Sequence, residues 1–154
     1  MKQISISSEA FEDGSSIPVE HTCDGDDRSP ALSWEGIPNG TRSIALIMDD
    51  PDAPGRTFVH WVIYNIPADS VGLPAAVPKD TSLNDGSTQG KNDFGKIGYN
   101  GPCPPPGKPH RFFFKVYALD TRLNLKSDVT RSQLESAMKG HILAQGNITG
   151  KYQR

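Results

Sequence analysis

The chain has 154 residues, a net charge of −2 at pH 7 and 35% hydrophobic residues. This length is typical of a single domain, here residues 1–154, which can bury roughly two-thirds of its extended surface. The balanced charge forms no basic stripe, which argues against nucleic-acid binding by phosphate neutralisation. No apolar run is long enough to span a membrane.

The first segment alternates like a short strand over residues 3–7 and contains no apolar signal core, so a cytoplasmic location is expected. The two cysteines, Cys23 and Cys103, are too few for a disulfide framework. A single bridge between them is possible, but the sequence does not show whether their atoms meet.

Residues 12–30 are polar and rich in turn-forming residues, with Asp24-Gly25-Asp26-Asp27 at their centre. This run lacks the alternating ligands and the distal glutamate of an EF-hand, so a solvated turn is favoured over a calcium loop. A short strand is expected at residues 32–34. The apolar run at residues 43–48 then leads into an acidic loop.

The acidic loop, Asp49-Asp50-Pro51-Asp52-Ala53-Pro54, places three carboxylates within four positions. Its two prolines hold them in a defined loop, and each X–Pro bond is a candidate for a cis peptide. Residues 58–64 follow as a strand buried on both faces. Strict alternation along this strand puts His60 on the side that carries Phe58, Val62 and Tyr64.

Residues 68–97 show little hydrophobic periodicity and many glycines, aspartates and asparagines. A stretch of this length without regular structure is unusual inside a compact domain. Leu73, Val77 and Leu83 provide anchors. We therefore expect an ordered surface excursion that covers a crevice or serves an interface.

The pattern of a proline loop, a histidine and a hydrophobic strand occurs a second time, in loop 98–109 and strand 110–120. Two such strand entrances placed side by side would bring four polar side chains around one crevice: Asp50, Asp52, His60 and His110. For Arg111 we consider a role in a structural ion pair, and for Tyr99 a packing role.

One helix is predicted near the C-terminus. Thr130 and Gln133 fit a capping box, an apolar face follows, and Gly140 supplies a stop. Residues 142–152 are expected to form a last strand. Strand patterns outnumber this helix, which indicates a mainly β fold, either a sandwich or a distorted barrel, with one peripheral helix.

Several ordered motifs resemble those of the phosphatidylethanolamine-binding protein family, especially its bacterial and archaeal branch: D-P-D-A-P at 50–54, H-W at 60–61, G-Y-x-G-P-C-P-P at 98–105 and H-R-F-x-F-x-V-Y-A-L-D at 110–120. The family includes the Raf kinase inhibitor proteins of animals. The resemblance runs from about residue 11 to residue 152. It implies a large central antiparallel sheet packed against a smaller sheet.

The resemblance also implies a small anion-binding pocket for phosphate-like groups such as phospholipid headgroups, lined by Asp50, Asp52, His60, Gly101, Pro102 and His110. Phe112 stands where the family usually has tyrosine, so one hydroxyl at the pocket is missing. Neighbouring carboxylates are expected to favour the imidazolium form of the histidines. Anion binding should therefore weaken as the pH rises.

These features favour a non-enzymatic binding module that captures a small anion and regulates a protein kinase or a serine protease. One alternative is a serine-protease inhibitor that acts through an exposed loop, either 102–109 or 68–97. Another is a metal-dependent hydrolase using His60, His110, Asp50 and Asp52, although no H-x-x-x-H spacing fixes such ligands. No cofactor is predicted. A homodimer is considered, as in prokaryotic members of the family.

Overall fold

The long strands predicted from the sequence lie side by side in the computed structural model, which describes residues 2–154. They are β4 (Ser43–Asp50), β5 (Phe58–Pro67), β8 (His110–Leu119) and β9 (Ile142–Tyr152). The shorter strands are β1 (Lys2–Gln3), β2 (Ser5–Ser7), β3 (Leu32–Glu35), β6 (Gly72–Leu73) and β7 (Thr88–Gln89). A 3-10 turn, η1 (Val19–His21), and one helix, α1 (Arg131–Met138), complete the described elements.

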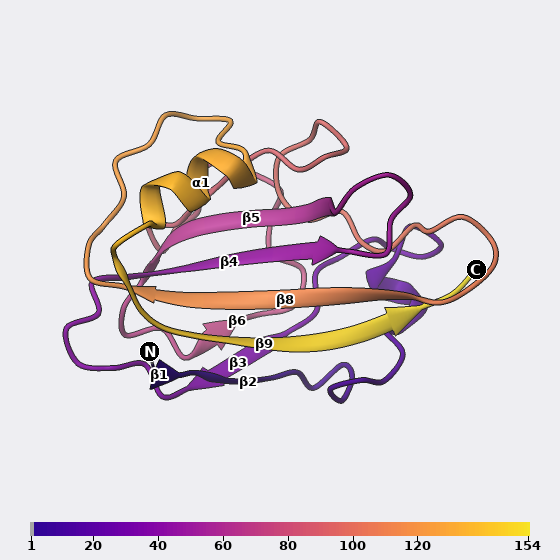
Figure 1. The fold of residues 1–154 in the computed structure, drawn as a ribbon, viewed down its shortest axis with the longest axis horizontal. Helices are drawn as coiled ribbons and strands as arrows, with labels where there is room; N and C mark the ends of the chain where they lie inside the picture. The colour runs from indigo at the N-terminus through magenta and orange to yellow at the C-terminus, as the bar shows by residue number, and fades with distance from the viewer. Residues whose placement is uncertain (1) are drawn as a thin grey trace.

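The strands form two sheets. The larger sheet has six strands in the order β1-β9-β8-β4-β5-β7, and the smaller has three in the order β2-β3-β6. All neighbours in the larger sheet are antiparallel except β1 and β9, which pair in parallel. Figure 1 shows the large sheet crossing the molecule with the small sheet below it. The predicted mainly β fold, a large sheet packed against a smaller one, is confirmed.

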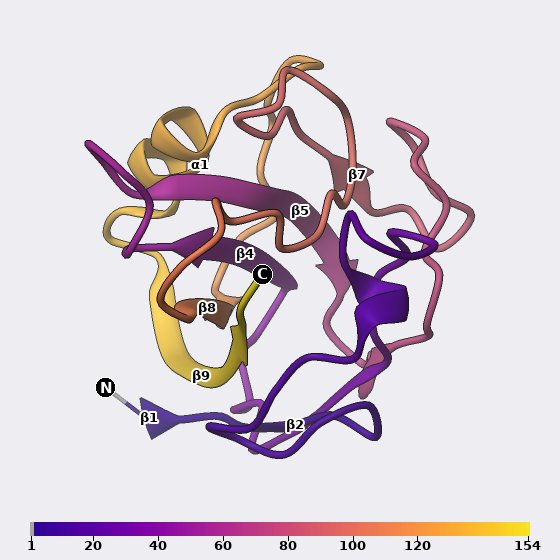
Figure 2. The ribbon, with the colours of Figure 1, turned by 90° about the vertical axis from the view of Figure 1, so that its right-hand side faces the viewer.

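Each face of the large sheet carries its own hydrophobic core. The face toward the small sheet packs Phe112 and Phe114 of β8 against Leu32 and Trp34 of β3. The opposite face packs residues of β4 and β5 under α1. Figure 2 shows the resulting three layers, with the helix on one side of the curved large sheet and the small sheet on the other. The two cores explain why β4 and β5 are buried along nearly their whole length.

Helix α1 begins and ends as its sequence predicts. The hydroxyl of Thr130 accepts from the N–H of Gln133, and the Gln133 side chain accepts from the N–H of Thr130. This reciprocal capping box satisfies two amides that would otherwise lack partners. Leu134 and Met138 point into the core under the helix. Gly140, with φ of 84°, follows the last turn in the left-handed conformation that glycine adopts without strain.

Residues 68–97 form an ordered excursion, as predicted, and the structure shows that it contributes a strand to each sheet. Leu73 and Val77 are buried, and Leu83 packs against the same core. β6 extends the small sheet, while β7 extends the large one. The side chain of Gln89 accepts from the Trp61 indole and donates to the carbonyls of Pro78 and Asp80. These bonds hold in place the stretch between β6 and β7, which has no regular structure of its own.

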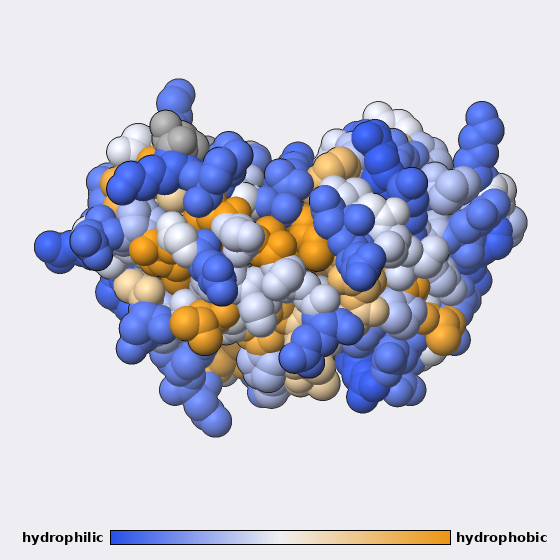
Figure 3. Space-filling model, turned by 90° about the horizontal axis from the view of Figure 1, so that it is seen from below, coloured by the Kyte–Doolittle hydropathy of each residue, from blue (hydrophilic) through white to orange (hydrophobic). Residues whose placement is uncertain are grey.

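The surface is mostly polar. Figure 3 shows the molecule from below, where hydrophilic side chains cover most of the surface and the hydrophobic residues are scattered among them, mainly in the left and central parts of the view. Within residues 2–154, no helix has the length and apolar character needed to cross a membrane.

Candidate functional site

A cavity of about 230 Å³ opens at the end of the large sheet where β4 stops and where β5 and β8 begin. Figure 2 looks onto this end of the molecule. The cavity, which we call the histidine pocket, is lined by three polar side chains, a disulfide-bonded cysteine and an apolar wall: Asp50, His60, His110, Cys103, Ala53, Pro54, Phe58, Phe94, Pro104 and Pro105. Its three ionisable groups are all buried, with exposures of 3% for Asp50, 3% for His60 and 9% for His110.

The structure brings together three of the six residues that the sequence analysis predicts to line the anion-binding pocket. Asp50, His60 and His110 line the histidine pocket. Gly101 and Pro102 lie just before its Cys103–Pro105 wall in the same loop. A Cβ at Gly101 would collide with the carbonyl of His21, so only glycine allows this loop to pack against η1. Asp52 turns away from the pocket.

Each of the three clustered carboxylates has a different partner. Asp49 faces the helix side of the sheet, where it accepts from Lys115 at 2.9 Å and Arg131 at 3.1 Å. Asp50 accepts from His110. Asp52 pairs with Arg111. The acidic loop therefore supplies the histidine pocket with one carboxylate, Asp50, and not with the two that the sequence predicts. A bound anion meets correspondingly less negative charge.

The Asp52–Arg111 pair is a two-point contact. Arg111 Nε lies 2.9 Å from Asp52 Oδ2, and its Nη2 lies 2.8 Å from Oδ1. The backbone N–H of Arg111 donates to the same carboxylate. These donors hold the pKa of Asp52 at about 2, well below its usual value. Arg111 is thus the structural ion pair that the sequence analysis weighed.

The tight acidic loop contains no cis peptide. None of the peptide bonds among residues 2–154 is cis, so the suggested cis bond at Asp50–Pro51 or Ala53–Pro54 is wrong. The turn closes instead through a side chain, because Asp50 Oδ1 accepts from the N–H of Asp52 at 2.8 Å. This local bond gives the loop its sharp course with trans prolines.

His60 lies at a β-bulge, which moves it to the face opposite the one that alternation predicts. Met48 pairs with Trp61 and the next residue, Asp49, pairs with Val59, so His60 is an extra residue on β5. Val62 and Tyr64 lie in the core under α1. The ring of His60 packs against Phe112 on the other face, with centroids 5.3 Å apart.

The hydrogen bond of His60 sets the tautomer of its neutral ring. Its Nδ1 lies 2.7 Å from the carbonyl oxygen of Asn100, and a carbonyl only accepts, so Nδ1 carries the proton. Nε2 is then the basic nitrogen. Burial lowers the pKa of His60, although the Asn100 carbonyl, the charges of Asp50 and Asp27 and the Gly101 backbone act in the opposite direction. Contrary to the expectation from sequence, His60 is held neutral because desolvation outweighs the carboxylates.

His110 is oriented by a buried carboxylate. Its Nδ1 lies 2.7 Å from Asp50 Oδ2, and both side chains are almost fully enclosed. The ionised carboxylate accepts the Nδ1 proton, which leaves Nε2 as the nitrogen that can meet a ligand. An imidazolium at this position is compensated by the charge of Asp50.

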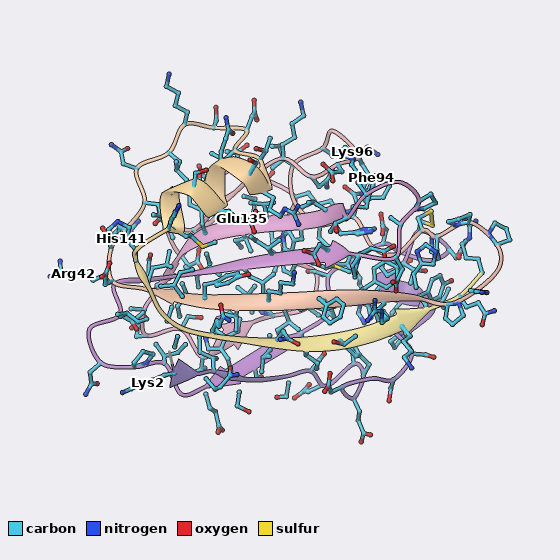
Figure 4. All side chains as sticks on the ribbon, in the orientation of Figure 1. Lys2, Arg42, Phe94, Lys96, Glu135 and His141 are labelled. Atoms are coloured by element: carbon cyan, nitrogen blue, oxygen red, sulfur yellow. A yellow bond between two sulfur atoms is a disulfide. The ribbon has the colours of Figure 1, made fainter. Side chains whose placement is uncertain are left out.

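The walls of the pocket are aromatic. Phe112 is fully buried and stacks beside His110, with ring centroids 6.4 Å apart. Phe94, from the 68–97 excursion, packs edge-on against His60 at 5.4 Å and Phe58 at 4.8 Å. Figure 4 places Phe94 at the same end of the molecule as the C-terminus. The excursion therefore supplies part of the pocket wall, whereas Phe112 packs against the two histidine rings without lining the cavity.

Two features that support the pocket were not found from the sequence. Asp27 accepts from the N–H of Gly101 at 2.7 Å and from the side chain of Asn100 at 3.1 Å. It thereby holds the loop whose carbonyl orients His60. The turn around Asp27 is thus a support for the pocket rather than a solvated turn, and no local pattern marks it as one.

The second feature is a disulfide between Cys23 and Cys103, which joins residues 80 positions apart with a Cα–Cα distance of 5.4 Å. Cys103 lines the histidine pocket, so the bridge attaches the pocket wall to the turn that contains Asp27. The question that the sequence left open is answered in favour of a bridge.

The metal-hydrolase alternative lacks a donor set. Among residues 2–154, no group of three or more His, Cys, Asp or Glu side chains is arranged to hold a metal ion. The Nδ1 atoms of both histidines are engaged with a carbonyl and a carboxylate, and Asp52 is engaged with Arg111.

Comparisons with known proteins cover nearly the whole chain. Residues 7–153 match the family model described as phosphatidylethanolamine-binding protein. A UPF0098 protein from Methanothermobacter thermautotrophicus is 50% identical over 98% of this chain and 99% of its own length. A UPF0098 protein from Aquifex aeolicus is 50% identical over 97% of this chain and 88% of its own length.

Two solved structures share the fold. YbcL from E. coli, described as a member of the mammalian PEBP family, has a TM-score of 0.92 and 36% identity, with 99% of each chain covered. CT736 from Chlamydia trachomatis, described as a putative PEBP homologue, has a TM-score of 0.90 and 35% identity, covering 100% of this chain and 99% of its own.

Proposed function

Because this chain belongs to the phosphatidylethanolamine-binding protein family, we propose that its histidine pocket captures a small anion of the phosphate-monoester type and catalyses no reaction. The observation that carries the proposal is the pair of buried imidazoles. Each has its Nδ1 fixed by a different acceptor, and both line one small cavity.

The two histidines offer complementary hydrogen bonds. Neutral His60 presents Nε2 as an acceptor, while the imidazolium form of His110 presents Nε2–H as a donor. A phosphate monoester in its monoanionic form carries both a hydroxyl and anionic oxygens. Its hydroxyl would donate to His60, and an anionic oxygen would accept from His110. Because the pocket already holds the Asp50 carboxylate, binding of an anion that has no proton to donate, such as sulfate, should depend on the positive charge of His110.

The apolar wall favours an ester over inorganic phosphate. Phe58, Phe94, Pro54 and two prolines of the opposite loop surround the polar floor. An organic group attached to the phosphate would displace water from these surfaces, which adds a hydrophobic contribution to binding. The ligand class is therefore a phosphate ester with a compact organic part.

The lining of the pocket supports binding rather than catalysis. Among its residues, the one cysteine is held in a disulfide, and there is no serine, threonine or lysine. The groups left that could act as nucleophiles are Asp50 and the two histidines, and Asp50 Oδ2 and both Nδ1 atoms are already engaged in hydrogen bonds. Regulation of a kinase or a serine protease stays a prediction.

The test is calorimetric titration with sulfate and with phenyl phosphate from about pH 5.5 to pH 8.5, a range that brackets ordinary histidine titration. Sulfate does not titrate in this range, so its pH dependence reports the protein alone. We expect sulfate affinity to fall as the pH rises and to drop at least about tenfold in His110→Ala, since a charged hydrogen bond is lost. His110→Gln, which keeps the size of the side chain, should lose the pH dependence as well.

His141→Ala is the matched control. His141 also bonds a carboxylate through Nδ1, at 2.8 Å from Asp120, but both side chains are nearly half exposed, and Figure 4 places His141 at the far end of the molecule. Its removal should leave sulfate binding unchanged. Sulfate affinity that stays flat or rises with pH, or that His110→Ala leaves intact, would show that the imidazoles are structural.

A further inference from the structure

A second recess adjoins the histidine pocket, and the two share His110 as a wall. It has a volume of about 480 Å³ and is lined mainly by basic side chains: Asp52, Lys108, Pro109, His110, Arg111 and Lys151. We call it the lysine recess. Its residues come from the acidic loop, loop 98–109, the start of β8 and the end of β9, beside the C-terminus in Figure 1.

The recess is electropositive in a protein whose net charge is negative. Three cationic side chains (Lys108, Arg111 and Lys151) and one carboxylate (Asp52) give it a net charge of +2, against −2 for the whole chain. Asp52 neutralises Arg111 through the two-point contact. The surplus positive charge therefore resides on the two lysines.

Neither lysine is neutralised by the protein. Within residues 2–154, no Asp or Glu lies within salt-bridge distance of the ammonium group of Lys108 or Lys151, whereas the neighbouring Arg111 and Arg154 both have acidic partners. Lys151 is also directly opposite Arg111 in the β8–β9 register. This position brings Lys151 beside the Asp52–Arg111 pair, whose carboxylate is already engaged by Arg111.

We propose that the lysine recess is a second anion subsite, and that the ligand is a small phosphate ester carrying a further anionic group that binds Lys108 and Lys151. This inference rests on the proposed function, because the first phosphate occupies the histidine pocket. The two groups would lie on either side of the His110 ring. Lysine ammonium groups bind phosphate as point charges and demand little geometry, so the second group can be a phosphate or a carboxylate.

Because His110 lines both cavities, binding of an anion in one should affect binding in the other. Two anions on opposite sides of one imidazole both favour its protonated form. Occupation of the recess should therefore strengthen binding in the histidine pocket beyond the gain expected from two independent contacts. Asp50 and Asp52, which face the ring from β4 and from the acidic loop, limit this effect without cancelling the lysines.

The experiment compares matched mono- and bisphosphates by calorimetry at one pH and one ionic strength. The probes are 3-hydroxypropyl phosphate, propane-1,3-diyl bisphosphate and its pentane-1,5-diyl homologue, which varies the spacing. A ligand with two equivalent phosphates gains a statistical factor of two. We expect at least one bisphosphate to bind roughly tenfold more tightly than the monophosphate, since exposed ion pairs contribute about a few-fold each and the two phosphates add the statistical factor.

The variant Lys108→Gln/Lys151→Gln should reduce this ratio to about two and change monophosphate affinity little. The control variant, Lys2→Gln/Arg42→Gln, removes the same charge from exposed side chains that Figure 4 places at the opposite end of the molecule. It should keep the full ratio. All four side chains are exposed, so both variants should fold like the unmodified protein.

The outcomes separate the two proposals. If the monophosphate binds but no bisphosphate exceeds the statistical factor, the lysine recess is not a subsite, while the histidine pocket stands. A large ratio that survives removal of both lysines also rejects the subsite. If none of the three probes binds, the proposed function fails, and the subsite fails with it.

Discussion

His110 and Asp50, which are 60 positions apart in the chain, are joined by a 2.7 Å hydrogen bond between Nδ1 and Oδ2 inside the histidine pocket. The two residues occupy the ends of β8 and β4, which are neighbours in the large sheet. The pair therefore links the fold to the pocket, because strand pairing brings the partners together and their contact orients the imidazole.

We expect this pair to contribute substantially to stability. In a double-mutant cycle of Asp50→Ala and His110→Ala, measured by urea unfolding at pH 7, the coupling free energy should be about 1.5–3 kcal/mol, as for buried hydrogen bonds to a charged group. The exposed pair His141–Asp120 has nearly the same bond length and provides the control. Its coupling should stay below about 1 kcal/mol because solvent screens it. Equal couplings for the two pairs would contradict a role for burial.

The Asp27 carboxylate should matter as much for the pocket as the residues that line it. Asp27→Ala leaves the N–H of Gly101 and the side chain of Asn100 without their acceptor. We expect a loss of about 1–3 kcal/mol in the free energy of unfolding, the usual penalty for a buried unpaired donor. Sulfate affinity should fall as well, because the Asn100 carbonyl that orients His60 shifts.

Asp26→Ala is the control for this prediction. It removes the same charge from the preceding residue, whose side chain is exposed. The two variants should differ clearly in their free energy of unfolding and in their sulfate affinity measured by calorimetry. Asp27→Ala with unchanged stability and sulfate binding would show that the loop does not need this support.

The sequence predicts the parts of this fold that local patterns encode. Strands β4, β5, β8 and β9 follow from hydrophobic runs, and α1 follows from its capping box and apolar face. The meeting of His60 and His110 follows from two similar loop–strand boundaries. These features depend on residues close together in the chain, so their signal is present without a structure.

The remaining features depend on pairings between distant segments. The bulge at His60 arises from the register between β4 and β5, and the amino acids of β5 carry no mark of an extra residue. The sequence likewise gives no sign that Asp49, Asp50 and Asp52 each have a different partner. Asp27 reaches a loop more than 70 positions away. Such contacts follow from the tertiary arrangement and are not visible in spacing.

The disulfide should stabilise both the domain and its pocket wall. Closing a loop of 80 residues removes unfolded-state entropy equivalent to about 4 kcal/mol. We therefore expect reduction, or the variant Cys23→Ser/Cys103→Ser, to lower the melting temperature by roughly 10 °C. Sulfate affinity should also fall, because Cys103 lines the pocket. Calorimetric scans with and without reductant, with thiol alkylation to confirm reduction, provide the measurement.

An unchanged melting temperature after complete reduction would contradict this expectation. Disulfides persist in oxidising compartments and also inside cells of hyperthermophiles. The bridge is therefore compatible with more than one location, and the expected cytoplasmic location stays a prediction.

Our last prediction is that Phe94 helps to keep the pKa of His60 low. Its ring packs against His60 at 5.4 Å, and burial is the main cause of the lowered pKa of that imidazole. Phe94→Ala should admit water to the pocket and raise the pKa of His60 toward its ordinary value. The change is measured by following the His60 ring signals by NMR as the pH is lowered.

The sign of the effect on stability follows from the same shift. His60 in the native protein takes up its proton at a lower pH than it does in the unfolded chain, so acid favours unfolding as the pH falls below about 6.5. In Phe94→Ala this difference shrinks, and the part of the acid-induced loss of stability that comes from His60 should shrink with it. Urea unfolding at pH 7 and at pH 5 tests this directly.

Val71→Ala is the matched control, because Val71 lies in the same excursion, is 77% exposed and does not line the pocket. It should leave both the His60 titration and the pH dependence of unfolding unchanged. If Phe94→Ala and Val71→Ala give the same His60 pKa, the excursion does not shield the imidazole. A lower pKa of His60 in Phe94→Ala would contradict this prediction, since added water can only favour the charged ring.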